Sequence, residues 1–391
     1  MRISIDSAGT KNSVQGLLVL MMLVMSSLLL GQAATAYGDA STGGAGESSS
    51  YQPSNGLSGK VTIAGSDTMR PLVMRLAGEF GRLHPDVRFT LEGGGSSAAI
   101  REFVMDLSQQ RRADKARSGH GGAGRVSLIA SSRPLTSGEI KAFTSQHGYE
   151  PVGIPIAIDA VVLYVNPENP IEGLTQEQVA AIFGEGDHQG RSKISTWGQV
   201  GLGGDWENRK IRLYGRDKKS GTREFIERHV LHGRPADADI LEQPGSATEI
   251  LAIARDPNAI GYAGAGFQTN LVRMVPLARK KGEPFVTPIP DTVKQGTYPL
   301  TRYLYFYVDK DPKEGFEPII KEFLTFANSS TGQTIITRAG IYQLADKQLA
   351  RNAALLRGES ATALGDPKDD PRLAAANENT ANDPLETPKE D

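Results

Sequence analysis

The sequence predicts an α/β fold with two lobes, and three observations lead to that class. Strand-like and helix-like segments alternate through most of the chain, which is typical of a parallel sheet with helices on its faces. Two β-rich runs, at 153–167 and 298–309, are longer than a usual strand and far apart in the sequence, so they could join two lobes as a hinge. The chain has 391 residues, enough for two lobes or domains.

The first part of the alternation runs from residue 60 to residue 131. Short apolar runs predict strands at 60–65 (KVTIAG), 87–93 (VRFTLEG) and 125–131 (RVSLIAS). Between them, apolar residues recur at every third or fourth position in 71–84 and 98–107, which predicts two helices. This succession favours parallel pairing of the strands.

A second alternating part lies between the two long runs. It predicts a helix at 174–184 (LTQEQVAAIFG), a strand at 210–216 (KIRLYGR), a helix at 223–231 (REFIERHVL) and a strand at 259–264 (AIGYAG). Two similar blocks joined by two long strands therefore agree with the prediction of two lobes.

The N-terminus has the pattern of a secretory signal. An apolar run at 16–31 follows a polar stretch with basic residues, and Ala34 and Ala36 then have A-x-A spacing. We expect cleavage near Ala36, and a periplasmic or secreted protein that begins near Tyr37. A retained membrane anchor is the alternative, but the run is short of the roughly 20 residues that a span needs.

Composition suggests how the rest of the chain divides. A Gly- and Ser-rich stretch at 37–58 predicts a flexible leader after the signal at 1–36, and the acidic, Pro- and Asn-rich 351–391 predicts a mostly disordered tail. The folded part is expected to form lobe 1 from 59–156 with 300–350, and lobe 2 from 157–299.

Charge and cysteine content exclude several classes of function. The formal net charge is −2, which argues against nucleic acid as a partner, and the chain has no cysteine, which excludes disulfides, thiolate metal sites and cysteine nucleophiles. The insertion at 106–124 carries basic residues in a Gly- and Ser-rich context, which is typical of a solvated loop. They are Arg111, Arg112, Lys115 and Arg117.

Three segments share one local design. In 64–72 (AGSDTMRPL), 92–100 (EGGGSSAAI) and 215–225 (GRDKKSGTREF), a strand leads through Gly and Ser or Thr into an amphipathic helix. A helix start offers unpaired N–H groups and a partial positive charge, so it suits an anion. One such turn is usually an ordinary N-cap, whereas three of them beyond strand ends predict a shared anion site.

Arg216 is the fixed charge that we expect at this site. Its planar guanidinium can hold two oxygens of one anion. A surface salt bridge with the neighbouring Asp217 is the alternative, and Asp217 could also orient the guanidinium. Lys218 and Lys219 are expected to be solvated.

With these segments in view, the chain resembles the phosphate-binding proteins of bacterial phosphate ABC transporters, the PstS type. The likeness covers about 60–345 and also includes IASSRPLTSGE, IAIDAVVLYVNPENPI, NAIGYAG and GTYPLTRYLYFYV in the same order. The resemblance implies a type II periplasmic-binding-protein fold, in which each lobe is a mostly parallel mixed sheet flanked by helices and two strands form the hinge. It implies a monomer that captures inorganic phosphate, needs no cofactor and delivers its ligand to a membrane ABC permease.

The resemblance also implies the phosphate ligands. Thr68 with the N–H of Met69 matches the family's first loop, and Ser96 the second, with Ser97 beside it. The R-x-x-x-S-G-T loop matches at Arg216, Ser220, Gly221 and Thr222.

The third family loop departs from the pattern. Many members have an Asp where this chain has Ser132, and that Asp accepts the proton of hydrogen phosphate and repels sulfate. Asp67 is a possible substitute acceptor, or else a turn carboxylate that faces away. We expect phosphate to remain the ligand.

Other readings of the sequence are weaker. A metal at His229 and His232 lacks the carboxylate of an H-E-x-x-H pattern, so cations at a helix end are favoured. Ser220 lacks both a G-x-S-x-G elbow and an evident His–carboxylate partner, so we do not expect an enzyme. A secreted phosphatase, or a phosphate sensor or scaffold without transport, remains the alternative function.

Overall fold

The computed structural model describes residues 50–105, 126–186 and 192–359. The predicted signal with its cleavage near Ala36, the 106–124 insertion and the tail beyond 359 lie outside the described residues.

The strands are short except for the two that the sequence singled out. They are β1 (Gly59–Gly65), β2 (Val87–Glu92), β3 (Leu128–Ser131), β4 (Val152–Val165), β5 (Leu174–Thr175), β6 (Arg212–Arg216), β7 (Leu241–Gln243), β8 (Ala259–Gly264), β9 (Arg273–Val275), β10 (Leu277–Ala278) and β11 (Thr301–Val308).

Helices follow most of the strands. The α-helices are α2 (Arg70–Leu83), α3 (Ser96–Met105), α5 (Ser137–His147), α6 (Gln176–Phe183), α7 (Gly221–His229), α8 (Ser246–Ala254), α9 (Pro290–Lys294), α10 (Pro318–Asn328), α11 (Ser330–Arg338) and α12 (Asp346–Arg357). Short 3₁₀ turns are η1 (Trp197–Val200), η2 (Gly204–Trp206) and η3 (Ala265–Phe267).

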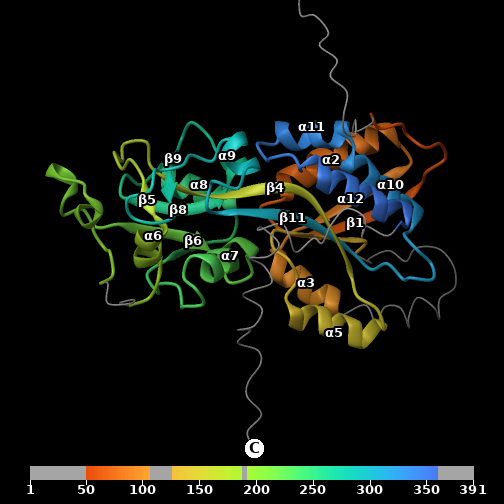
Figure 1. The fold of residues 1–391 in the computed structure, drawn as a ribbon, viewed down its shortest axis with the longest axis horizontal. Helices are drawn as coiled ribbons and strands as arrows, with labels where there is room; N and C mark the ends of the chain where they lie inside the picture. The colour runs from red at the N-terminus through yellow and green to blue at the C-terminus, as the bar shows by residue number, and fades with distance from the viewer. Residues whose placement is uncertain (1–49, 106–125, 187–191, 360–391) are drawn as a thin grey trace, which may run out of the picture. The chain divides into compact units, whose positions relative to one another are not determined.

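One mixed sheet contains most of these strands, in the order β2-β1-β3-β11-β4-β8-β6-β7 with β9 also paired to β4, while β10 and β5 pair in a second sheet. Pairing is parallel among β2, β1 and β3, which we call the first half-sheet, and among β8, β6 and β7, the second half-sheet. The long strands β11 and β4 pair antiparallel between the two halves (Figure 1). The predicted α/β class with a mixed sheet is confirmed.

The apolar sequence of β4 explains its central place. From Ile154 to Val165 every side chain is buried, as expected of a strand covered on both faces. Asp159 is the charged residue in this apolar strand, and its carboxylate is as deeply buried as its apolar neighbours. The register sets it opposite Arg302 of β11.

Helices cover both faces of the first half-sheet (Figure 1). α2, α10, α11 and α12 pack together on one face, where Phe80, Phe323 and Phe326 form a cluster of aromatic rings. α3 and α5 lie on the other face, where Phe103 stacks on Phe143 with ring centroids 5.0 Å apart. Aromatic packing of this kind contributes beyond its buried area.

Two expected boundaries differ from the structure. The disordered tail was expected from 351, but α12 continues to Arg357 and buries Asn352 and Leu356, because Asn352 donates to the Pro155 carbonyl of β4 and Leu356 joins the apolar core. The flexible leader was expected to reach 58, but Tyr51 already donates a hydrogen bond to Glu322 at 2.8 Å and packs on Phe326.

Among residues 50–105, 126–186 and 192–359, no helix has the length and apolar character to cross a bilayer.

Candidate functional site

The loop between β6 and α7 is shaped by a helix cap. Ser220 is the N-cap residue of α7, and its Oγ accepts hydrogen bonds from the N–H groups of Thr222 at 3.2 Å and Arg223 at 3.4 Å. Both lone pairs of the hydroxyl are therefore used, and its proton is left to donate elsewhere.

The loop between β1 and α2 touches this cap from the first half-sheet. Thr68 Oγ1 lies 2.9 Å from Thr222 Oγ1, and both residues are buried. The N–H of Met69, which the resemblance assigns to phosphate, donates to Ser66, at 3.1 Å to its carbonyl and 3.3 Å to its Oγ. The Met69 N–H therefore already has a partner within its own turn.

The start of α3 and the loop after β3 complete the cluster. Ser96 Oγ lies 3.1 Å from Ser132 Oγ and accepts from the Ser132 N–H, also at 3.1 Å. Gly221 fits against this pair so closely that an added Cβ would lie 2.7 Å from Ser132 Oγ and 2.8 Å from Ser96 Oγ. Residues from both half-sheets thus meet in one small volume.

Arg216 is buried beside this cluster and is held by a set of directed contacts. Nη2 pairs with Asp67 Oδ2 at 2.9 Å and donates to the Pro244 carbonyl at 3.1 Å. Nη1 donates to Ser246 Oγ at 3.0 Å, and Nε to the Gln243 carbonyl at 3.3 Å. Among the described residues these contacts use four of the five guanidinium N–H groups and leave one on Nη1.

The carboxylate partner of Arg216 is therefore Asp67. The alternative of a salt bridge with Asp217 is wrong, because the Asp217 side chain instead accepts from the N–H of Lys219 at 3.1 Å. Asp67 does not face away from the cluster either. It follows a strand of the first half-sheet, and its carboxylate contacts the guanidinium of Arg216 in the second half-sheet.

Ser97 has different hydrogen-bond partners from Ser96. Its N–H donates to the Lys219 carbonyl at 3.3 Å, and its Oγ donates to Glu224 Oε2 at 2.8 Å. Glu224 also pairs with Arg133 and Arg228, so Ser97 joins α3 to a charged network on α7.

The pair formed by Asp159 and Arg302 was not predicted from the sequence. Arg302 Nη2 lies 2.9 Å from Asp159 Oδ2 and donates to Thr222 Oγ1 at 2.9 Å. Burial raises the pKa of Asp159 against the opposing effect of Arg302, and burial lowers the pKa of Arg302. The available signal was one charged residue in each of two otherwise apolar strands, IAIDAVV and PLTRYLY.

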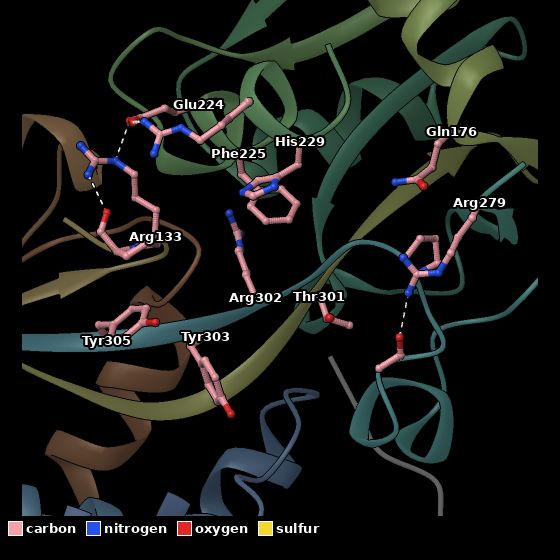
Figure 2. Close-up of a pocket in the computed structure, with 14 residues that line it drawn as sticks. Arg133, Gln176, Glu224, Phe225, His229, Arg279, Thr301, Arg302, Tyr303 and Tyr305 are labelled. Carbon is pink, nitrogen blue, oxygen red and sulfur yellow. Dashed lines mark hydrogen bonds and ion pairs between the residues drawn. The ribbon is translucent and has the colours of Figure 1, made fainter. Parts of the chain in front are cut away.

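A cavity of about 270 Å³ lies between α7 and β11 on the other side of Arg302 (Figure 2). Phe225 and His229 of α7 and Thr301 and Tyr303 of β11 are among the residues that line it. Arg302 thus separates the cavity from the hydroxyl cluster, with its Cζ 5.3 Å from the centroid of the Phe225 ring.

His229 behaves as a packing residue. Its ring lies against Phe225 with centroids 4.4 Å apart, and burial lowers its pKa to about 4. The expectation of a cation at this helix end is therefore wrong for His229, which is neutral at pH 7. In the described ranges no group of three His, Cys, Asp or Glu side chains is placed to hold a metal ion.

The electrostatics of the cluster favour an oxyanion. The starts of α2, α3 and α7 direct their partial positive charge toward it, and Arg216 and Arg302 lie beside it. The hydroxyls of Thr68, Ser96 and Thr222 can each donate one hydrogen bond. Such a set suits a small tetrahedral anion with several oxygens.

Comparison with known proteins agrees with the chemistry of this site. Residues 44–331 match the family model described as a PBP superfamily domain. The phosphate-binding protein PstS of Pseudomonas aeruginosa is 35% identical over 298 residues, which cover 76% of this chain and 87% of that protein. The Bacillus subtilis phosphate-binding protein PstS is 27% identical and covers 86% of this chain and 97% of its own length.

A solved structure supports the fold. The crystal structure of an ABC-type phosphate transport receptor from Vibrio cholerae aligns with a TM-score of 0.52 and 22% identity, over 73% of this chain and 100% of that one.

Proposed function

The chain belongs to the PstS-type family of phosphate-binding proteins in the periplasmic-binding-protein superfamily, and from that premise we propose that it captures inorganic phosphate and delivers it to a membrane ABC permease for uptake. One observation carries the proposal: Thr68, Ser96 and Thr222, from three separate loops, lie in one buried cluster beside Arg216.

Phosphate is held mainly by donors in this proposal. The hydroxyls of Thr68, Thr222, Ser96 and Ser132 exchange their bonds with one another for bonds to phosphate oxygens. Ser220 is suited to join them, because capping α7 uses its lone pairs and leaves its proton free. Several such bonds, after the cost of association, are consistent with micromolar or tighter affinity, about −8 kcal/mol.

Arg216 supplies the fixed positive charge. Its four contacts fix the plane of the guanidinium, so the remaining N–H on Nη1 is oriented before phosphate arrives. Preorganised donors cost less entropy on binding than mobile ones. A charge-assisted hydrogen bond of this kind contributes roughly 1.5–3 kcal/mol.

Asp67 supplies the negatively charged carboxylate that Ser132 lacks. A carboxylate at the rim accepts the proton of hydrogen phosphate and repels sulfate, which has no proton to share at neutral pH. The 2.9 Å contact with Arg216 supports this role, and it keeps the charge of Asp67 compensated. Asp67 is therefore our candidate for the residue that distinguishes the two anions.

The same contacts support closure of two lobes on the ligand. We assign 59–156 with 300–350 to one lobe and 157–299 to the other, with β4 and β11 as the hinge strands. Thr68 and Asp67 then face Thr222 and Arg216 across the interface. A ligand that bonds to both sides stabilises the closed arrangement by its differential affinity.

The proposal describes a binding protein and not a hydrolase. Relatives are named as binding proteins. The hydroxyl of Ser220 caps α7, and no His side chain is among its hydrogen-bond partners in the described part of the chain. We expect an exported, monomeric protein in the periplasm or outside the cell.

Calorimetric titration of the mature protein with phosphate and with sulfate tests this function. We expect micromolar or tighter phosphate binding in the parent protein and a loss of at least about 100-fold in R216A, because both a charge and a directed donor disappear. R212A is the matched control: Arg212 is on the same strand, but its side chain is 61% exposed. No heat with phosphate, or tighter binding of sulfate, would overturn the proposal.

A further inference from the structure

Arg302 is a buried cation that contacts Thr222, a proposed phosphate donor, but is not itself a proposed phosphate ligand. It lies on β11 and is 3% exposed. Asp159 Oδ2 accepts hydrogen bonds from Arg302 Nε at 3.1 Å and from Nη2 at 2.9 Å, and the Phe225 ring lies beside the Arg302 guanidinium. A charge this deep needs such partners, and these contacts leave the side chain little freedom.

The remaining contacts of Arg302 reach the start of α7. Nη2 donates to Thr222 Oγ1 at 2.9 Å, and Nη1 lies 3.4 Å from the Gly221 carbonyl. Both residues belong to the loop that meets the hydroxyls of Thr68, Ser96 and Ser132.

The direction of the bond to Thr222 is fixed by chemistry. A guanidinium has only donors, so Thr222 Oγ1 must accept from Arg302. A hydroxyl has a single proton, which then points away from Arg302. Thr68 Oγ1 lies 2.9 Å from Thr222 Oγ1 and can accept this proton, which marks where an anion oxygen would receive it.

We propose that Arg302 is a positioning residue for phosphate: it holds the Thr222 hydroxyl as a hydrogen-bond donor and anchors the start of α7, while Asp159 holds Arg302. The inference rests on the proposed function, since it names how one of the phosphate donors is oriented. Asp159 belongs to β4 and Arg302 to β11, so the proposed hinge strands themselves orient the ligand contact.

Removing Arg302 alone is a poor test, because it leaves the Asp159 carboxylate buried without a partner. A better comparison uses two variants that both lack the ion pair. D159N keeps the donation from Arg302 to Thr222, whereas D159N/R302Q lacks it. Each is then combined with T222V, which removes the hydroxyl and keeps the shape of the side chain, and T222S serves as the conservative variant that restores the acceptor.

Phosphate affinity by calorimetry is the readout, with thermal unfolding of each variant to identify those that do not fold. We expect D159N/R302Q to bind phosphate about tenfold or more weakly than D159N when residue 222 is Thr or Ser. In the T222V background the same comparison is expected to change affinity less than about threefold, because the group on which Arg302 acts is absent.

The outcomes distinguish failure of the proposed function from failure of the positioning role of Arg302. If the parent protein does not bind phosphate, the proposed function fails. If the parent binds but Arg302 contributes the same factor with and without the Thr222 hydroxyl, Arg302 acts as a general charge or as part of the core, and the positioning role is overturned. Equal affinity of D159N and D159N/R302Q also overturns it.

Discussion

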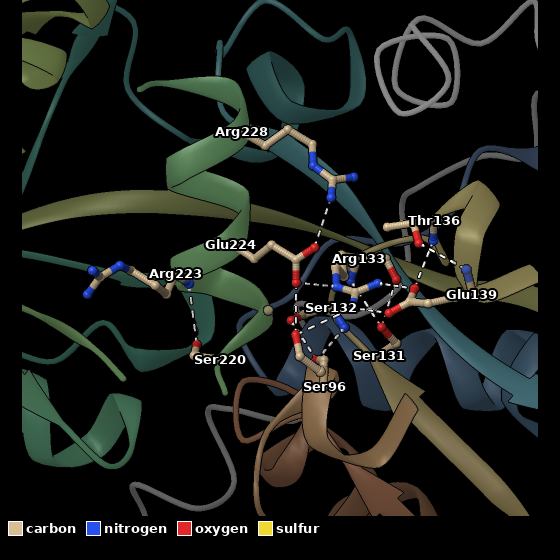
Figure 3. Close-up of polar contacts among 12 residues, drawn as sticks. Ser96, Ser131, Ser132, Arg133, Thr136, Glu139, Ser220, Arg223, Glu224 and Arg228 are labelled. Carbon is tan, nitrogen blue, oxygen red and sulfur yellow. Dashed lines mark hydrogen bonds and ion pairs between the residues drawn. The ribbon is translucent and has the colours of Figure 1, made fainter. Parts of the chain in front are cut away.

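Arg133 Nε lies 2.6 Å from Glu224 Oε2, and this ion pair joins the loop after β3 to helix α7 (Figure 3). Glu139 holds the other side of the Arg133 guanidinium at 2.8 Å, and Ser97 Oγ donates to Glu224 at 2.8 Å. The pair thus connects the two half-sheets beside the candidate site, and it uses no atom that we assign to phosphate.

Glu224→Gln is expected to weaken phosphate binding about 5- to 30-fold without removing any proposed ligand. Arg133 is 5% exposed and Glu224 26%, so the pair is partly desolvated and its loss costs more than that of a surface pair, about 1–2 kcal/mol. That energy is lost from the closed arrangement. Titration calorimetry measures the affinity, and the phosphate dissociation rate should rise.

The control is Glu227→Gln on the same helix, whose carboxylate pairs with Arg223 one turn away. It removes an equal charge but no contact between the half-sheets, so its phosphate affinity should match the parent protein. Parent-like affinity in Glu224→Gln would show that this pair does not assist closure.

Asp67→Asn is expected to reduce the preference for phosphate over sulfate. The variant lacks both the acceptor for the phosphate proton and the negative charge that repels sulfate, and it leaves Arg216 with less compensation. Sulfate affinity should therefore rise while phosphate affinity falls, each by about tenfold, in parallel titrations.

Asp217→Asn serves as the comparison, because that carboxylate is next to Arg216 in sequence but bonds to the Lys219 N–H instead. An unchanged ratio of the two affinities in Asp67→Asn would remove Asp67 from the account of selectivity and leave hydroxyl geometry.

Local sequence patterns predicted most of the elements that carry the site. The apolar runs gave β1, β4 and β11 to within three residues at each end, because strands buried on both faces must be continuously apolar. The Gly- and Ser-rich turns gave the starts of α2, α3 and α7, since a helix start needs capping groups wherever the helix packs.

Ion pairs between residues far apart in the sequence could not be predicted from local patterns. Asp217 is adjacent to Arg216 in the chain, yet Asp67 is its partner, because the fold brings the loop after β1 to the end of β6. Arg302 and Asp159 are likewise brought together by the pairing of β11 with β4. α8 was also not predicted from the sequence. This short helix begins with the polar residues SATE, and Glu249 within it is buried.

Gly221→Ala tests how closely α7 approaches the first half-sheet. The new methyl would lie 2.7 Å from Ser132 Oγ and 2.8 Å from Ser96 Oγ, closer than real Cβ contacts, so the two sides must separate. We expect phosphate affinity to fall at least about tenfold by calorimetry. If Gly221→Ala binds phosphate like the parent, the close approach is not required for binding.

Gly78→Ala is its matched control. Gly78 lies within α2, and nothing within 4 Å would meet the added methyl. Since Ala is a better helix former than Gly, the control should raise the free energy of unfolding by about 0.5–1 kcal/mol and leave phosphate affinity unchanged.

Glu249 makes the stability of the fold depend on pH. It is fully buried on α8, one oxygen accepts from the Tyr262 N–H at 2.9 Å, and burial raises its pKa from 4.5 to about 8. The unfolded chain loses this proton near pH 4.5, whereas the folded protein keeps it to about pH 8. Between these values the folded state binds more protons, so this group's contribution to stability falls as the pH rises.

Glu249→Gln replaces the protonated carboxyl with a neutral side chain of the same shape, so the variant should lack this pH dependence. In urea unfolding at pH 5, 6.5 and 8, we expect the free energy of unfolding of the variant to gain on that of the parent by up to about 1.4 kcal/mol per pH unit. The neutral His229 titrates with the opposite sign below its ordinary range, but it is present in both proteins and cancels in the difference. Glu242→Gln, with a side chain 47% exposed, is the control and should follow the parent at every pH. A constant difference between Glu249→Gln and the parent from pH 5 to 8 would mean that Glu249 does not hold its proton in the fold.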